Sequence, residues 1–493
     1  MTTEALPTSV ESRPVAEAAP RQRILVPLIV ACALFMENLD STVLATALPA
    51  IARSLDENPL HLNLAISAYL FSLAVFIPVS GWVADRFGAR TVFRGAIGIF
   101  LLGSVLCGLS PSLPAFVAAR ILQGMGGALM VPVGRLVLLR SVPKSELVSA
   151  MAYLTIPALI GPVVGPPLGG FIATYLSWRW IFWINIPVGI LGIILATRFI
   201  PAIREKHVPP LDVAGLLLTA IALTGLVFGF ETTGRDILPA PLVVLLLVVG
   251  ATAALVYVAH ARRASHPIID LSLLRIATFR ASVTGGSMFR IGIGAIPFLL
   301  PMMLQIGFHR TPFESGMLTF AAALGAMGMK TTAARILRRF GFRRVLIANA
   351  VVSSAFLAAF ALFRPTTPGW IIFAVLVSGG FFRSLQFTSI NTIAYADVPS
   401  QRMSLATSFA SAAQQLSLSI GVGTGALLLH LTAVAHGSTS VVAADFAPAF
   451  LGVALISALS TIVFTGLSRD AGSEVSGRPA HKPDAALPTT GAA

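Results

Sequence analysis

Long apolar stretches recur along almost the entire chain, separated by short clusters of charged and turn-forming residues. A stretch of about 20 apolar residues spans the hydrocarbon core of a bilayer as an α-helix. The pattern therefore predicts an all-α polytopic membrane protein with fourteen spans. Their predicted ranges are 24–50, 62–83, 92–110, 113–138, 147–173, 181–199, 211–230, 241–259, 278–306, 313–336, 345–363, 369–394, 405–430 and 447–468.

The composition supports this prediction. Hydrophobic residues make up 56% of the 493 residues and charged residues only 11%, whereas about 25% charged is usual in soluble domains. The net charge of +14 does not indicate a nucleic-acid partner, because most Lys and Arg lie in short loops on one side of the predicted membrane. That side is expected to be the cytoplasm, so both termini are predicted to be cytoplasmic.

A short repeat divides the spans into two sets. GWVADRFGARTVF begins at Gly81 after the second span, and ARILRRFGFRRVL begins at Ala334 after the tenth. Parallel repeats of this kind are typical of secondary transporters. The predicted domains are a disordered N-terminus (1–23), a six-helix bundle (24–200), a linker with two extra membrane helices (201–269), a second six-helix bundle (270–468) and a disordered tail (469–493).

The first span carries two acids near its middle. Glu37 and Asp40 are three residues apart, so they lie on roughly the same side of a helix. A carboxylate at membrane depth costs on the order of 3 kcal/mol on insertion scales. No other acid lies deep within a predicted span. We therefore predict a proton site here; the alternative is a structural hydrogen bond to a neighbouring helix.

Basic residues also occur inside predicted spans. Arg120 needs an acid or carbonyl partner, and Gln123 lies one turn further along the same helix. Arg290 and Arg383 lie mid-span in the second half of the chain. Two further bases lie nearer the ends of their spans: Arg135, which either snorkels to the interface or serves a site, and Lys330, which is expected to snorkel.

One stretch imitates a nucleotide-binding motif. GAMGMKTT, from Gly325, lacks the Gly that a phosphate loop needs directly before its Lys. The sequence holds no other nucleotide motif, no HExxH and no Cys/His cluster. We expect no enzyme activity, no metal and no cofactor, and energy from an ion gradient.

Four motifs in the N-terminal half carry a family resemblance. They are LDSTVLATALP from Leu39, GWVADRFGAR from Gly81, ARILQGMGGALMVP from Ala119 and GPVVGPPLGG from Gly161. The chain resembles the fourteen-helix drug:proton antiporters (EmrB/QacA-like) of the major facilitator superfamily. GAMGMK and NTIAYADVP in the C-terminal half resemble the MdtD-like branch. This resemblance implies an antiporter in a bacterial inner membrane that exports small amphipathic compounds by alternating access.

The resemblance also implies roles for the motif residues. It implies that Asp40 and Arg120 couple transport to protons. We add Glu37 to this predicted proton site, although similar proteins usually have an uncharged polar residue near its position. Two such neighbouring acids titrate as a coupled pair. The fourth motif implies an antiporter helix, thin and kinked, that rocks against the other half; its residues are Gly161, Pro162, Gly165, Pro166, Gly169 and Gly170.

The second motif implies a loop that latches one facing state. In it, Asp85 is expected to meet a helix N-terminus or an Arg from the other half. The predicted latch residues are Gly81, Asp85, Arg86, Gly88 and Arg90.

A substrate cavity is expected between the halves, because the first and fourth helices of each half line it in this superfamily. The arginines there make anionic, zwitterionic or neutral amphiphiles as acceptable as cations. The predicted cavity residues are Gln123, Arg290, Gln305, Arg383, Gln386 and Asn391.

Two other functions stay open. A proton symporter that takes up an organic anion is favoured by Arg290 and Arg383 and opposed by the motif from Gly161. A non-transporting membrane sensor is opposed by the intact latch and antiporter motifs. The expected partners are a small-molecule substrate, protons and the lipid bilayer, with no nucleic acid, and the protein is expected to be a monomer.

Overall fold

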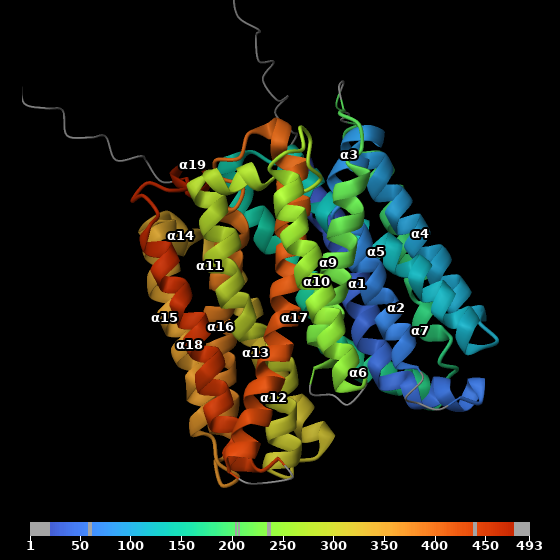
Figure 1. The fold of residues 1–493 in the computed structure, drawn as a ribbon, viewed down its shortest axis with the longest axis vertical. Helices are drawn as coiled ribbons and strands as arrows, with labels where there is room; N and C mark the ends of the chain where they lie inside the picture. The colour runs from blue at the N-terminus through green and yellow to red at the C-terminus, as the bar shows by residue number, and fades with distance from the viewer. Residues whose placement is uncertain are drawn as a thin grey trace, which may run out of the picture.

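The computed structural model describes residues 20–57, 62–202, 205, 208–233, 238–436 and 441–477, and these are almost entirely helical. Most helices run between the same two ends of the molecule (Figure 1). The first set is α1 (Pro20–Leu55), α2 (Asn63–Phe76), α3 (Ser80–Phe87), α4 (Ala89–Leu109), α5 (Leu113–Ser141), α6 (Leu147–Tyr175), α7 (Trp180–Trp183) and α8 (Asn185–Phe199). We call this set the N-terminal half.

The remaining helices fall into an inserted pair and a C-terminal half. The pair is α9 (Val213–Thr232) and α10 (Ala240–Ala261). The C-terminal half comprises α11 (Ala277–Gly294), α12 (Ile296–Met302), α13 (Pro312–Lys330), α14 (Ala333–Phe340), α15 (Phe342–Ala359), α16 (Gly369–Ile393), α17 (Met403–Ala435), α18 (Phe446–Thr465) and α19 (Ser473–Ser476). Short turns are η1 (Lys144–Glu146), η2 (Leu271–Arg275), η3 (Met303–Gly307), η4 (Phe360–Leu362), η5 (Ser400–Arg402) and η6 (Ala443–Asp445).

Each predicted span range contains a helix or a pair of helices. Within the described residues, 11 helices are long and apolar enough to cross a membrane, or up to 12 if the bent pair α2 and α3 forms one span. α6 and α13 occupy two further predicted ranges but are not among these helices. An all-helical membrane fold is therefore confirmed, whereas the number fourteen is not.

The second predicted span, 62–83, is not one straight helix. α2 and α3 meet at an angle of 61°. Pro78 lies in the break between them, and proline cannot donate the backbone hydrogen bond that would continue the helix. The predicted latch loop is accordingly wrong in form, because Gly81, Asp85 and Arg86 lie on the short helix α3.

The sequence repeat has the same backbone form in both halves. α3 ends at Gly88 (φ 90°), directly before α4, and α14 ends at Gly341 (φ 76°), directly before α15. Both glycines adopt a positive φ, which side chains with a Cβ rarely tolerate. The two copies therefore make the same tight reversal between a short helix and a long one.

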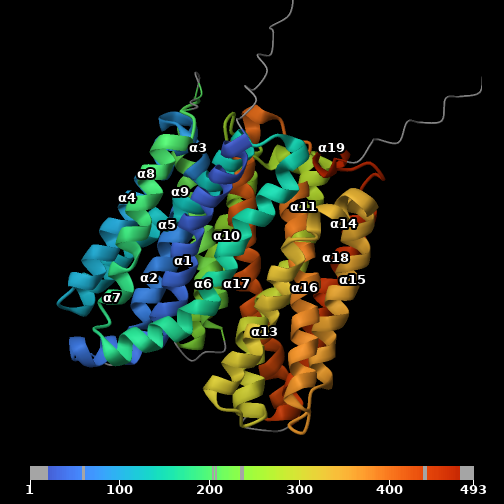
Figure 2. The same ribbon diagram turned by 180° about the vertical axis from the view of Figure 1, so that it is seen from behind.

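The two halves meet along a seam. In the N-terminal half, α1 packs along α6, and α5 along α2 and α4; in the C-terminal half, α13 packs along α16, and α11 along α17 and α18. Across the seam, α3 and α5 contact α17, and α6 contacts α13 and α16. The inserted helix α9 packs against α17 of the C-terminal half and α2 of the N-terminal half, so the inserted pair contacts both halves through α9 (Figures 1 and 2). The five predicted domains and their boundaries stay a prediction.

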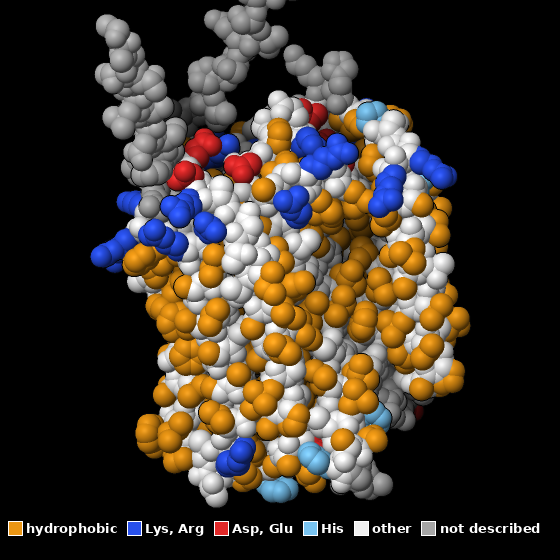
Figure 3. Space-filling model, turned by 60° about the vertical axis from the view of Figure 1, so that its left-hand side comes forward, with side chains coloured by type: hydrophobic (Ala, Val, Ile, Leu, Met, Phe, Trp, Pro, Cys, Tyr) orange, Lys and Arg blue, Asp and Glu red, His pale blue; other side chains and the backbone are white. Residues whose placement is uncertain are grey.

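Basic side chains mark one end of the molecule. Figure 3 shows Lys and Arg gathered around one end of the visible face, beside a broad hydrophobic band. This is the end at which α3, α14 and α19 lie (Figure 1). We call it the basic end, and the opposite end, where α7 and α12 lie, the far end.

Candidate functional site

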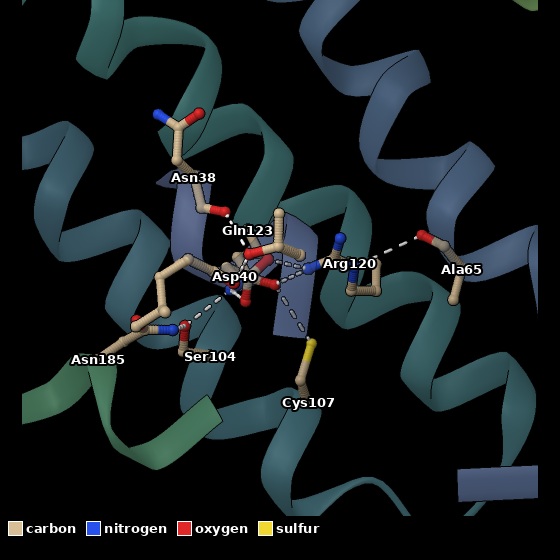
Figure 4. A network of polar contacts seen from close by, with 10 residues as sticks. Asn38, Asp40, Ala65, Ser104, Cys107, Arg120, Gln123 and Asn185 are labelled. Atoms are coloured by element: carbon tan, nitrogen blue, oxygen red, sulfur yellow. Dashed lines mark hydrogen bonds and ion pairs between the residues drawn. The ribbon is translucent and has the colours of Figure 1, made fainter. Parts of the chain in front are cut away.

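A network of charged and polar side chains lies inside the N-terminal half (Figure 4). Arg120 of α5 donates from Nη1 to Asp40 Oδ2 of α1 at 2.6 Å and to Gln123 Oε1 at 2.5 Å. Gln123 Nε2 donates to Asp40 Oδ1 at 2.9 Å and to Ser104 Oγ of α4 at 2.8 Å. Asn185 of α8 donates to the same Ser104 hydroxyl at 3.3 Å. Four helices thus hold one ion pair.

This ion pair is sealed from solvent. Asp40 and Arg120 are each 1% exposed. The Arg120 guanidinium lies 4.4 Å from the centre of the Tyr69 ring, and its Nε donates to Ala65 O at 3.5 Å. Breaking a buried pair by neutralising one partner costs about 3–5 kcal/mol, because the other charge stays buried and unpaired. The pair therefore contributes strongly to the packing of α1 against α5.

Glu37 lies in the same helix but outside this network. Its side chain is partly exposed, and its buried Oε2 has no hydrogen-bond partner among the described residues. The Tyr69 hydroxyl is also buried without such a partner. Glu37 is within electrostatic reach of both Asp40 and Tyr69. Of the two acids, Glu37 is the one whose side chain is partly exposed, whereas Asp40 is buried.

The antiporter-motif helix packs on the other side of the same stretch of α1. A Cβ on Gly161 would lie 3.0 Å from Leu39 N, and one on Gly165 would lie 2.2 Å from Thr42 Oγ1. These glycines let the two backbones approach closely. The tightest approach of α6 at these glycines is therefore to α1 of its own half.

The other motif residues are less informative. Gly169 is buried in α6. The backbone of Pro162, Pro166 and Gly170 is helical, but their side-chain environments lie outside what the structure describes. α6 also contacts α13, α14 and α16 across the seam. The predicted rocking of α6 against the other half stays a prediction.

Asp85 connects the two halves at the basic end. Its carboxylate accepts from Arg140 Nη2 of α5 at 3.1 Å and from the Ser404 hydroxyl in the first turn of α17. Arg140 also donates to Glu205 at 2.9 Å. Asp85 therefore meets a helix N-terminus of the other half, one of the two expected partners, while its Arg partner comes from its own half.

The remaining latch residues surround this contact. Ser80 Oγ lies 2.8 Å from Ser408 Oγ of α17. A Cβ on Gly81 would lie 2.6 Å from Ser404 O, so only glycine permits this approach. Arg90 donates to a backbone carbonyl, Ile200 O, at 3.3 Å. Gly88 ends α3, and Arg86 lies in its last turn.

The structure does not bring the six predicted cavity residues together. Arg290 and Asn391 do meet, with Arg290 Nη2 donating to Asn391 Oδ1 at 2.8 Å. Gln123 belongs to the Asp40 network instead. Gln386 is fully buried between α15 and α16, where it bonds to Asn349 and Leu346.

Arg383 and Gln305 lie elsewhere again. Arg383 lines a cavity of about 20 Å³ inside the C-terminal half, enclosed by residues of α11, α13, α15, α16 and α18. Gln305 is exposed near the far end, 3.4 Å from Ser315 Oγ. The spacing of residues along single helices could not separate an inward-facing side chain from one that faces the seam.

Two bases near the ends of their predicted spans are buried. Lys330 is 7% exposed and donates to Thr388 Oγ1 at 2.6 Å, so the prediction that it snorkels is wrong. Arg135 is also 7% exposed and donates from Nη1 to Tyr395 Oη of the other half at 3.2 Å. Tyr395 lies within NTIAYADVP, but that motif indicated only a family branch, and nothing in the sequence singled out Tyr395 or Ser404 as a partner across the seam.

Comparison with known proteins places this architecture in a family. A profile of the major facilitator superfamily matches residues 30–422 and, in a second match, 282–490. The chain belongs to the major facilitator superfamily. Within it, the chain belongs to the MdtD-like branch of the drug:proton antiporters.

Two relatives show the extent of the similarity. The putative multidrug resistance protein MdtD of Pectobacterium carotovorum subsp. carotovorum (strain PC1) is 39% identical over 447 residues, which covers 90% of this chain and 95% of the relative. The protein of that name from Escherichia coli (strain K12 / DH10B) is 39% identical over 449 residues, covering 90% and 94%. As a member of this family, the chain is a multi-pass inner-membrane transporter rather than an enzyme.

Solved structures share the fold at low sequence identity. The human organic anion transporter MFSD10 matches with a TM-score of 0.66 and 14% identity, covering 90% of this chain and 100% of that one. The proton:xylose symporter XylE matches with a TM-score of 0.62 and 13% identity, covering 92% and 97%. At these identities the likeness concerns the fold alone.

Proposed function

We propose that this protein is a proton-coupled antiporter that exports small amphipathic compounds by alternating access, as in multidrug efflux. The observation that carries the proposal is the sealed pair between Asp40 and Arg120. The relatives named as multidrug resistance proteins support the substrate class. Basic loops favour the cytoplasmic side, so the basic end is assigned to the cytoplasm, with both termini there.

Proton coupling follows from the chemistry of the pair. In this scheme a proton from the far side first binds Glu37, which is partly exposed, and then passes to Asp40. Protonated Asp40 loses its charge, so Arg120 loses its counter-ion and the α1–α5 contact weakens. Substrate binding from the cytoplasm favours the deprotonated form, in which the pair is restored. One proton site thus alternates with the substrate.

The latch supplies the conformational half of the scheme. Polar contacts between the halves, such as those from Asp85 to Ser404 and from Ser80 to Ser408, gather at the basic end. The conformation described is therefore assigned to the state closed toward the cytoplasm. Opening that end requires these contacts to break. Breaking them is the conformational step that accompanies the proton step.

The test is export driven by a pH gradient. Inside-out vesicles or proteoliposomes carrying Asp40→Asn are expected to show no pH-driven substrate movement per molecule of folded protein, while membrane insertion is retained. Exposed Glu314 of α13 provides a control, because Glu314→Gln changes an acid outside the network. Retained proton–substrate exchange in the Asp40→Asn protein would sink the mechanism.

Uptake of an organic anion is the second candidate. The observation that favours it is the presence of buried bases that have no carboxylate partner within the part of the chain that the structure describes, among them Arg290 and Lys330. The same vesicles distinguish the two functions. Antiport moves substrate against the direction of the imposed proton flow, whereas symport moves both in one direction.

A further inference from the structure

Three buried bases lie along the seam between the halves. Arg135 comes from α5 of the N-terminal half, Arg290 from α11 and Lys330 from α13 of the C-terminal half. Their exposed fractions are 7%, 3% and 7%. Within the described ranges, none of the three forms an ion pair with an Asp or Glu. We call these three residues the seam cluster.

All three bases reach one short segment, 387–395, of α16 and the residues that follow it. Arg135 donates to Tyr395 Oη, and Lys330 to Thr388 Oγ1. Arg290 donates to Asn391 Oδ1 at 2.8 Å, and its guanidinium lies 5.5 Å from the centre of the Phe387 ring. Each acceptor is neutral. Residues three and four apart lie on one face of a helix, so Phe387, Thr388 and Asn391 form one continuous strip.

The donors of this cluster exceed its acceptors. Each Arg carries five N–H donors, and the contacts above use one on Arg135 and one on Arg290. Arg290 Nε is buried with no hydrogen-bond partner among the described residues. Arg135 also lies within electrostatic reach of Arg290, so the two positive charges repel each other. Burying such charges unpaired costs several kcal/mol per ion.

The N-terminal half contains a buried Arg whose charge is balanced within the protein. Arg120 has a carboxylate at 2.6 Å and a glutamine at 2.5 Å. Among the described residues, the seam cluster has no carboxylate partner, and its one amide partner is Asn391, 2.8 Å from Arg290. Guanidinium groups match carboxylate and phosphate oxygens through two parallel hydrogen bonds, which makes an anion the natural counter-charge.

We propose that Arg135, Arg290 and Lys330 form a binding site for the anionic group of a ligand, a carboxylate or a phosphate, at the seam between the halves. The inference rests on the proposed transport function, because it assigns the charge class of the transported compound. Phe387 supplies an aromatic face for the ligand's apolar part. Since Arg135 belongs to one half and the other two bases to the other, the bound anion draws the halves together.

The test compares one ligand in two charge states. Purified protein in nanodiscs of phosphatidylcholine is titrated with an aromatic amphiphilic carboxylate and with its methyl ester, which keeps the apolar body and removes the charge. The wild-type protein is expected to bind the acid more tightly than the ester. Arg290→Gln is expected to weaken the acid about 10- to 100-fold, as for a lost charge-assisted hydrogen bond, and to leave the ester unchanged.

Two further variants separate charge from packing. Arg280 lies at an exposed position of the same helix, α11. The Arg280→Gln variant is therefore expected to bind both ligands like the wild type. Arg135→Gln is expected to repeat the effect of Arg290→Gln from the opposite half. Equal affinity of the wild type for acid and ester would overturn the proposal, and so would an equal loss of both ligands in Arg290→Gln.

The occupant can be a free solute or a lipid headgroup, and a second arm tells them apart. Adding phosphatidylglycerol to the nanodiscs weakens binding of the acid if headgroups occupy the site, and leaves it unchanged if only free solutes do. The binding assay needs no proton gradient. If Asp40→Asn still transports, the proposed coupling fails while the preference for the acid stands; if wild-type preference is absent but coupling holds, only the anion site fails.

Discussion

Buried bases in this protein differ in how their charge is balanced. Arg120 shares its site with Asp40 and Gln123, each within hydrogen-bond distance, whereas Lys330 has only the Thr388 hydroxyl among the described residues. Removing one residue of a balanced ion pair destabilises the protein strongly, because the remaining charge stays buried without a counter-charge. The two kinds of base should therefore respond differently to mutation.

The Asp40–Arg120 pair predicts strong coupling between two substitutions. Asp40→Asn or Arg120→Gln alone is expected to destabilise the protein by about 3–5 kcal/mol, since each leaves a buried group uncompensated. The double variant should lose clearly less than the sum, because both charges go together. Melting temperatures in detergent measure this cycle, and additive losses would contradict the pairing.

The sequence indicated which buried polar residues matter, but it did not indicate toward which neighbouring helix each side chain points. Asp40 and Arg120 were paired correctly because a buried acid requires a nearby base, whereas Gln123 was assigned to the cavity but bonds to Asp40. Gln386 was assigned to the seam but packs inside its own half, because these helices are apolar on most sides and offer no polar face to orient them. Pairs between halves, such as Arg135 with Tyr395, depend on long-range packing that one sequence does not encode locally.

At the scale of helices, glycine positions decide how closely neighbours approach. α13 and α16 cross at Gly325 and Gly380. A Cβ on Gly325 would lie 1.8 Å from Val377 O, and one on Gly380 would lie 2.0 Å from Ala322 O. Because the obstructing atoms belong to backbone, the clash cannot be relieved by rotating a side chain. The stretch that imitates a phosphate loop, GAMGMK, is thus a helix-packing element.

Gly325→Ala is accordingly expected to separate α13 from α16 and to lower the yield of folded protein and its melting temperature. Gly328→Ala is the matched control on the same helix, since a Cβ there meets no atom within 4 Å. In a helix interior Ala is favoured over Gly by about 1 kcal/mol, so the control should be neutral or slightly stabilising. Similar losses for both variants would contradict the close crossing.

The linker between α10 and α11 predicts a pH effect. Asp270 accepts from Ser272 N at 2.9 Å and from Arg402 Nη2 at 2.5 Å. Burial raises the pKa of Asp270, but the hydrogen bonds from Ser272 and Arg402 outweigh it and hold the pKa below its usual value. A carboxyl group with a lowered folded pKa adds stability above its unfolded pKa, about 3.9, and this stability is lost as the pH falls through the folded value.

Asp270→Asn removes this titration. The melting temperature of the variant is expected to fall less steeply than that of the wild type as the pH drops below about 4. Near neutral pH the variant should be the less stable of the two, because it lacks the charged contact with Arg402. Parallel pH profiles would show that Asp270 does not contribute in this way.

At the scale of the molecule, transport by alternating access requires the basic end to open. Polar contacts join the halves there, among them Ser80 with Ser408 and Asp85 with Ser404. Contacts inside one half need not break during transport, since each half can move as a unit. Ser354 and Ser457, for example, lie 2.9 Å apart through their hydroxyls, on α15 and α18 of the C-terminal half.

These two serine pairs provide a matched crosslinking test. In a background with Cys32 and Cys107 replaced by Ala, the pair Ser80→Cys and Ser408→Cys is expected to form a disulfide on mild oxidation, because the hydroxyls lie 2.8 Å apart. The crosslink should stop substrate movement, and reduction should restore it. The pair Ser354→Cys and Ser457→Cys should also crosslink yet leave transport largely intact. Unimpaired transport across an oxidised seam would show that the halves need not part at this end.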